Sequence, residues 1–169
     1  MSNDLYQASV PQFLRMLNNL KGILEKAGAH AAEKKIEESA LLDARLFPDM
    51  FPLTMQVRIA TDFARGTTGR LAGSEPPKTE DNEKSFAELI ARVDAAIAYV
   101  RGFSAPSFAG AEERKISRKI RGAERTFSGT DYLYQYSLPN FYFHLTTAYA
   151  ILRHNGVAIG KGDFVGLFG

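Results

Sequence analysis

The chain has 169 residues, 45% of them hydrophobic and 24% charged, which is typical of one globular domain with a sizeable core. We therefore expect a single domain over residues 1–169. The formal net charge of +2 at pH 7 argues against nucleic acid or an anionic membrane as a partner. The sequence has no cysteine, which excludes disulfides, thiol nucleophiles and zinc–cysteine sites.

The sequence also predicts the compartment. Its first residues show no basic region followed by an apolar run, which a secretory signal requires. No window approaches the roughly 20 apolar residues of a membrane span. We therefore expect a cytoplasmic protein without a membrane partner.

Two long helices are predicted in the first half of the chain. Apolar residues recur with the helical period from Leu5 to Leu24, which predicts a helix that is kinked at Pro11 and closed by Gly28. A short helix over 31–38 and a packed connection should follow. The second long helix should span 52–71.

A third helix is predicted over 82–101, after a loop rich in proline and glycine. On the polar face of the second helix, Arg58 and Asp62 are four residues apart and could form a surface ion pair. Residues 103–129 break the helical period, so we expect either a short hairpin or a polar loop there. The basic run 114–121 lacks interleaved aromatic residues and is interpreted as a solvated face.

The last long helix should begin at Pro139 and end at Gly156, since proline suits the first helical turn and glycine the stop. It is apolar on almost every side, as expected of a helix buried among others. With the three preceding helices it predicts an all-α four-helix bundle, with the hairpin or loop between the third and fourth helices. The tail over 157–169 should form an irregular cover.

Histidines are the first candidates for a metal site. On the last helix His144 faces inward, and His154 lies about 80° to one side at 3.6 residues per turn. The residues four positions before and after His144 are Asn140 and Ala148, neither of which is a strong ligand for zinc or iron. We therefore predict no bound metal, with His144 and His154 as the remaining candidates for a divalent cation.

Polar residues predicted to face the bundle centre form the second candidate site. Because buried polar groups must be hydrogen-bonded, this set could form a closed network. A cavity with a few convergent polar groups is also the usual small-ligand site. Both interpretations stay open for the four residues, Gln56, Asn140, His144 and Thr147.

Other catalytic motifs give no signal. The stretch 156–162 is similar to a phosphate loop, but it is one residue short, has no Ser or Thr after Lys161 and follows a helix. No Ser-His-Asp order or carboxylate pair indicates hydrolysis.

Four motifs resemble a known bacterial family. They are Phe51-Pro-Leu-Thr-Met-Gln56, Phe127-Ser-Gly-Thr-Asp-Tyr-Leu133, Pro139-Asn-Phe-Tyr-Phe-His144 and Gly160-Lys-Gly-Asp163-Phe. Over nearly its whole length the chain resembles the family catalogued as domain of unknown function nineteen-ninety-three, a branch of the DinB/YfiT-like superfamily. The resemblance implies a four-helix bundle with an up-down-down-up order and frequent homodimers.

The resemblance also implies a metal site that this sequence keeps only in degenerate form. Many superfamily members bind a divalent metal through three histidines, one on the second helix and two spaced i, i+4 on the fourth. Some of these act as thiol-dependent transferases or isomerases. Here Gln56 stands at the second-helix position, and of the fourth-helix pair only His144 is a histidine.

We therefore predict a small-ligand-binding or non-catalytic protein that needs no cofactor. Its pocket should lie around Gln56 and His144, and its partners should be a small molecule and a second copy of the chain, but not nucleic acid. Whether the protein is an enzyme stays open. The alternatives are a metal-dependent transferase or hydrolase that uses His144, and a structural dimer module.

Overall fold

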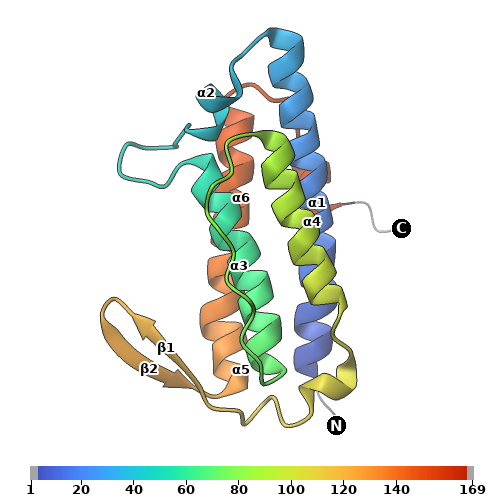
Figure 1. Cartoon of the computed structure of the whole chain (residues 1–169), viewed down its shortest axis with the longest axis vertical. Coiled ribbons are helices and arrows are strands. Elements are labelled where there is room, and N and C mark those ends of the chain that lie inside the picture. The colour runs from blue at the N-terminus through green and yellow to red at the C-terminus, as the bar shows by residue number, and fades with distance from the viewer. Residues whose placement is uncertain (1–3, 167–169) are drawn as a thin grey trace.

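Four long helices run side by side in the computed structural model, which describes residues 4–166 (Figure 1). Helices α1 and α6 run in one direction, and α3 and α4 run in the other (Figure 1). No helix within the described residues is long and apolar enough to cross a membrane. The protein is thus mostly helical, and the long helices are α1 (Asp4–Lys34), α3 (Leu53–Leu71), α4 (Phe86–Arg101) and α6 (Leu138–His154).

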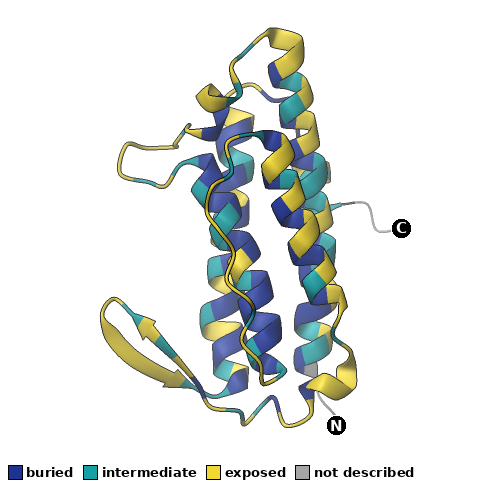
Figure 2. Ribbon diagram, in the orientation of Figure 1, coloured by how far each residue is buried: buried dark blue, intermediate teal, exposed yellow. Residues whose placement is uncertain are grey.

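The apolar faces of these helices meet in one core (Figure 2). Phe13 of α1 and Phe141 of α6 are fully buried and pack edge to face, with ring centroids 4.9 Å apart. This is a favoured geometry for aromatic pairs. Burial of the repeated apolar residues that the sequence shows therefore holds the helices together.

Helix α1 continues past Gly28, where the sequence predicted its end. A Cβ atom at Gly28 would lie 3.4 Å from the Cβ atom of Phe86, so the glycine gives α4 a close approach to α1. The separate helix predicted over 31–38 is wrong, because α1 continues to Lys34 and stops before Lys35, whose φ is 54°. A short helix, α2 (Glu38–Leu42), follows.

Between α4 and α6 the chain forms the hairpin, one of the two alternatives predicted there. After a 3₁₀ turn, η1 (Ala105–Phe108), strand β1 (Ile116–Ile120) pairs antiparallel with β2 (Ala123–Phe127). The two turn residues Arg121 and Gly122 have φ angles of 49° and 85°, the positive values that tight hairpin turns require.

Helix α6 is preceded by one continuous helical entry. Helix α5 (Gly129–Asp131) leads into a π-helical turn, η2 (Tyr132–Ser137), which passes directly into α6. A Cβ atom on Gly129 would lie 1.8 Å from the carbonyl oxygen of Ala111, so only glycine fits there. The turn after η1 and the start of this helical entry are therefore closely packed.

The tail is more ordered than the sequence predicted. Helix α7 (Lys161–Val165) packs on α1. The carboxylate of Asp163 accepts a hydrogen bond from the backbone N–H of Gly160 at 2.8 Å and an ion pair from Lys26 at 2.6 Å. The expected irregular cover is therefore wrong over these residues.

Candidate functional site

Gln56 of α3 and His144 of α6 form a direct hydrogen bond across the core. Nδ1 of His144 lies 2.7 Å from Oε1 of Gln56, and Nε2 of Gln56 donates to the carbonyl of Phe51 at 3.0 Å. Because the amide nitrogen is used by Phe51, the amide oxygen must accept, so Nδ1 of His144 carries the proton. The imidazole lone pair is then on Nε2.

The surroundings keep this histidine neutral. Gln56 is 1% exposed, and His144 is half-buried beside it. Burial lowers the pKa of His144 below its ordinary value of 6.5, because a cationic ring loses hydration there. At neutral pH the pair is a closed, uncharged contact.

The other predicted site residues do not join this contact. The side chain of Asn140 donates to the carbonyl of Tyr136 at 2.7 Å, and that of Thr147 donates to the carbonyl of Phe143 at 2.7 Å. Both side chains therefore bond to a backbone carbonyl four residues earlier in the chain, and not to the pair of Gln56 and His144. His154 is exposed at the end of α6.

The residues present do not fit the three-histidine metal site that the resemblance implies. Gln56 uses its oxygen on the imidazole proton, and Ala148 stands one helical turn after His144. Among residues 4–166, no three His, Cys, Asp or Glu side chains lie close enough together to hold a metal ion. His144 would be a lone imidazole ligand, which is too few for a protein zinc site.

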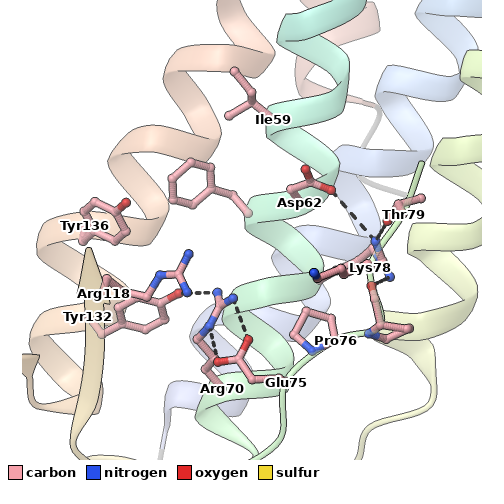
Figure 3. A pocket seen from close by; sticks show the side chains of 13 residues that line it. Ile59, Asp62, Arg70, Glu75, Pro76, Lys78, Thr79, Arg118, Tyr132 and Tyr136 are labelled. Atoms are coloured by element: carbon pink, nitrogen blue, oxygen red, sulfur yellow. Dashed lines mark hydrogen bonds and ion pairs between the residues drawn. The ribbon is translucent and has the colours of Figure 1, made fainter. Parts of the chain in front are cut away.

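A pocket of about 620 Å³ lies one aromatic ring away from His144 (Figure 3). The ring is that of Phe63, which stacks on His144 with centroids 6.3 Å apart and meets Tyr136 edge-on at 5.5 Å. Phe63 and Tyr136 line the pocket, whereas His144 does not. The whole lining is Ile59, Asp62, Phe63, Arg65, Arg70, Glu75, Pro76, Pro77, Lys78, Thr79, Arg118, Tyr132 and Tyr136.

One wall of the pocket is the connection between α3 and α4, residues 72–85, which we call the strap. It returns along the two helices over their length (Figure 1). Arg92 of α4, with its side chain 3% exposed, donates to Glu83 at 2.8 Å and to Asp81 at 3.0 Å, both in the strap. The same guanidinium donates to Asp62 of α3 at 2.8 Å, so it joins three parts of the fold.

Arg58 completes this cluster and corrects a prediction. It donates to Glu83 at 2.6 Å, and Asp62 binds Arg92, so the predicted surface pair between Arg58 and Asp62 is wrong. Burial opposes ionisation of Glu83, but hydrogen bonds from Arg92, from the backbone and from Arg58 outweigh it and lower the pKa of that carboxyl. Burial raises the pKa of Asp62, and Arg92 offsets only part of that effect.

Two pocket arginines already have hydrogen-bond partners. Arg70 makes a two-pronged ion pair with Glu75, both distances 2.8 Å, and donates to the Tyr132 hydroxyl at 3.0 Å. Arg65 donates to the Thr79 hydroxyl and to a strap carbonyl. These contacts fix the strap side of the pocket.

Two further cations in the lining are unpaired. Within residues 4–166, the side chains of Lys78 in the strap and Arg118 in β1 have no hydrogen-bond or ion-pair partner. In Figure 3 Arg118 lies on the side of Tyr132 and Tyr136, while Lys78 lies on the side formed by the strap. The pocket therefore combines an aromatic wall with free positive charge.

The chain matches the family described as Domain of unknown function (DUF1993) over residues 5–165. It belongs to this family. A solved structure described as a DinB family member protein from Shewanella denitrificans is 43% identical, with a TM-score of 0.91, and the match covers 97% of this chain and 93% of that one. The comparison with curated proteins gives no match. The family predicted from the motifs is therefore confirmed for this DUF1993 protein.

Replacing Arg92 with Met should release the strap of this DUF1993 protein. We expect a loss of about 3 kcal/mol in the free energy of unfolding, because the buried carboxylate of Glu83 loses its main partner. The two half-exposed carboxylates should add little, since solvent screens them. Urea unfolding measures the loss, and trypsin should cut at Lys78 and Lys84 faster than in the wild type.

The Lys21→Met variant is the control, because it breaks the exposed ion pair of Lys21 with Asp94. It should leave stability almost unchanged. Equal losses in the two variants, or strap cleavage that stays at the wild-type rate, would contradict the role of Arg92.

The pH dependence of stability should reveal the buried imidazole. Because the pKa of His144 is lower in the folded than in the unfolded state, the unfolded state binds more protons at acid pH. The contribution of His144 should thus be complete above pH 6.5 and be lost as the pH falls through the folded pKa. The measurement is urea unfolding of wild type and His144→Gln across this range.

The difference in stability between these two proteins should shrink with falling pH. The exposed His154 gives a matched control, since His154→Gln should track the wild type at every pH. A wild-type advantage over His144→Gln that grows on acidification would overturn this account.

Proposed function

We propose that this protein binds a small organic molecule, without transforming it, in the pocket between α3, η2, β1 and the strap. The observation that carries the proposal is that one pocket is lined both by an aromatic wall, formed by Phe63, Tyr132 and Tyr136, and by the unpaired cations Lys78 and Arg118. A volume near 620 Å³ is within the range usual for small-ligand sites. Apolar walls with a few placed polar groups are also typical of such sites.

The pair of Gln56 and His144 belongs to this site as its support. It holds the imidazole against one face of Phe63, whose ring also lines the pocket. We propose that Asn140 and Thr147 likewise act as structure, since their side chains are satisfied by backbone carbonyls. The ligand would then contact the aromatic wall, and the polar pair would fix that wall.

Binding is supported better than catalysis by the state of the acids in the pocket. Asp62 and Glu75 are each committed to an arginine, so neither is poised as a general base. The metal-dependent alternative would use Nε2 of His144. It lacks a second and a third strong donor beside that atom among the described residues.

We also propose that residues 1–169 form one four-helix-bundle domain of the DinB kind. The side-by-side arrangement of the four long helices supports this proposal (Figure 1). We propose that two copies associate. Exposed aromatic residues support this, namely Phe47 at 64%, Phe51 at 52% and Phe143 at 56% exposure. Exposed apolar side chains that lie close together are typical of an interaction surface, and Phe47 and Phe51 stand four residues apart in the connection before α3.

Light scattering should then give a mass twice the 18.7 kDa of one chain. The Phe143→Glu variant should shift the mass toward that of one chain, because a charge would be buried in the interface. A single-chain mass for the wild type at the highest attainable concentration would rule out the dimer.

The ligand-binding proposal predicts that filling the pocket abolishes binding. A metabolite library should contain compounds that raise the melting temperature of the wild type, since a ligand that binds only the folded state stabilises it. Ile59→Trp should remove these shifts, because Ile59 lines the pocket and the larger ring would occupy it.

Ala95→Trp provides the matched control. Ala95 is exposed on α4 and does not line the pocket, so this variant should keep the shifts. The proposal fails if no compound stabilises the wild type, or if every shift survives in Ile59→Trp.

A further inference from the structure

The pocket also indicates which chemical class of ligand it takes, an inference that rests on the proposed function. We infer that the ligand is an organic anion, with a carboxylate or phosphate at one end of a flat apolar body. Lys78 and Arg118 would hold the anionic group. The aromatic wall, chiefly Phe63 and Tyr136, would hold the body.

The charge balance of the lining favours an anion. Four cations and two carboxylates line the pocket, and both carboxylates are already paired. Glu75 binds Arg70, and Asp62 binds Arg92. The net charge of the lining is therefore positive, and its cations without an ion-pair or hydrogen-bond partner among residues 4–166 are the side chains of Lys78 and Arg118. Two like charges facing one cavity repel each other, and an anion between them removes that cost.

Arg118 is aimed at the pocket by strand geometry. Along β1 the residues with odd and even numbers alternate between two faces. Ile116, Arg118 and Ile120 are on the more buried face, whereas Ser117 and Lys119 are exposed. Arg118 is thus the cation that the strand turns toward the body of the protein. Its planar guanidinium suits two-pronged binding of a carboxylate or phosphate.

The base of the hairpin holds Arg118 in this position. Phe127 of β2 stacks on Tyr136 with ring centroids 5.6 Å apart, and it packs against Tyr132 at 6.1 Å. The cation-bearing strand and the aromatic wall are therefore parts of one packed unit. The Tyr136 hydroxyl has no partner among residues 4–166, so it is available to donate to the same anionic group.

The aromatic wall by itself would also suit a cationic ligand, since cations bind over aromatic faces. Lys78 and Arg118 argue against that choice, because both would repel a cation inside the same cavity. A neutral aromatic ligand would fit the wall but leave the two cations unpaired. An anion with a flat apolar body can pack on the aromatic side chains and also pair with the two cations.

Calorimetric titration of the full chain can separate these classes. The probes are naphthoate, naphthyl phosphate, neutral naphthamide and inorganic phosphate, which vary the ring and the charge independently. Both anionic naphthalenes should bind about tenfold tighter than naphthamide, because hydrogen bonds to charged groups are the stronger ones. Inorganic phosphate should bind more weakly than naphthyl phosphate, because it has no body for the wall.

Variants at the two cations test the assignment of residues. Arg118→Gln and Lys78→Gln should each weaken naphthoate binding severalfold and leave naphthamide unchanged. Lys119→Gln is the matched control, because Lys119 follows Arg118 in β1 but is exposed on the other face of the strand and outside the pocket lining. It removes the same charge and should not change naphthoate affinity.

The outcomes separate this inference from the proposed function. Equal affinity for naphthamide and naphthoate, equal losses in Lys119→Gln and Arg118→Gln, or no binding of either anionic naphthalene would overturn the anionic class. Library compounds that lose their effect in Ile59→Trp would then still support the pocket. If no compound behaves in that way, the pocket function fails as well.

Discussion

Arg92 holds this fold in the form that creates the pocket. Helices α3 and α4 follow each other in the sequence yet run in the same direction (Figure 1), so the chain must travel back along their whole length. The returning strap is largely exposed and contains no helix or strand. Such a segment has few apolar contacts and needs other interactions to keep one path. A buried guanidinium bound to Glu83, Asp81 and Asp62 supplies them.

The position of the strap in turn decides the chemistry of the pocket. Its residues from Glu75 to Thr79 line one side, and Glu75 neutralises Arg70 on that side. Because Asp62 is turned to Arg92, its carboxylate does not compensate the free cations. The same ion pairs that tie down the strap therefore leave Lys78 and Arg118 as the unpaired charge of the cavity.

Sequence periodicity predicted the elements that depend on local pattern. The spacing of apolar residues gave the long helices, and the inward direction of Gln56 and His144 followed from the helical angle alone. In the hairpin turn, Gly122 supplies a positive φ that the turn requires. Taking glycine as a helix stop misplaced the end of α1, since Gly28 serves a close approach to Phe86. Its role depends on a partner distant in sequence.

The pocket itself could not be predicted in this way. Its charged residues pair between different segments of the chain, as Arg92 of α4 does with Glu83 of the strap. Their spacing in the sequence therefore does not predict these pairs. One signal was available. Arg92 lies three residues after Leu89 and four before Ala96, both fully buried, so helical geometry places it toward the core. A buried arginine requires carboxylate partners, and the acidic strap beside it was the nearest source.

The contact of Gln56 with His144 explains why the polar centre expected from the resemblance and the observed cavity lie at different places. In a three-histidine site the metal satisfies the imidazole nitrogens. Here the amide oxygen satisfies Nδ1 and the backbone of Phe51 satisfies the amide nitrogen, so the centre closes without a cation. A closed centre needs no open volume around it. The open volume lies instead beyond Phe63, where the aromatic rings and the unpaired cations line one cavity. A glutamine on α3, at the position where the resemblance implies a metal ligand, thus makes a packing contact with His144.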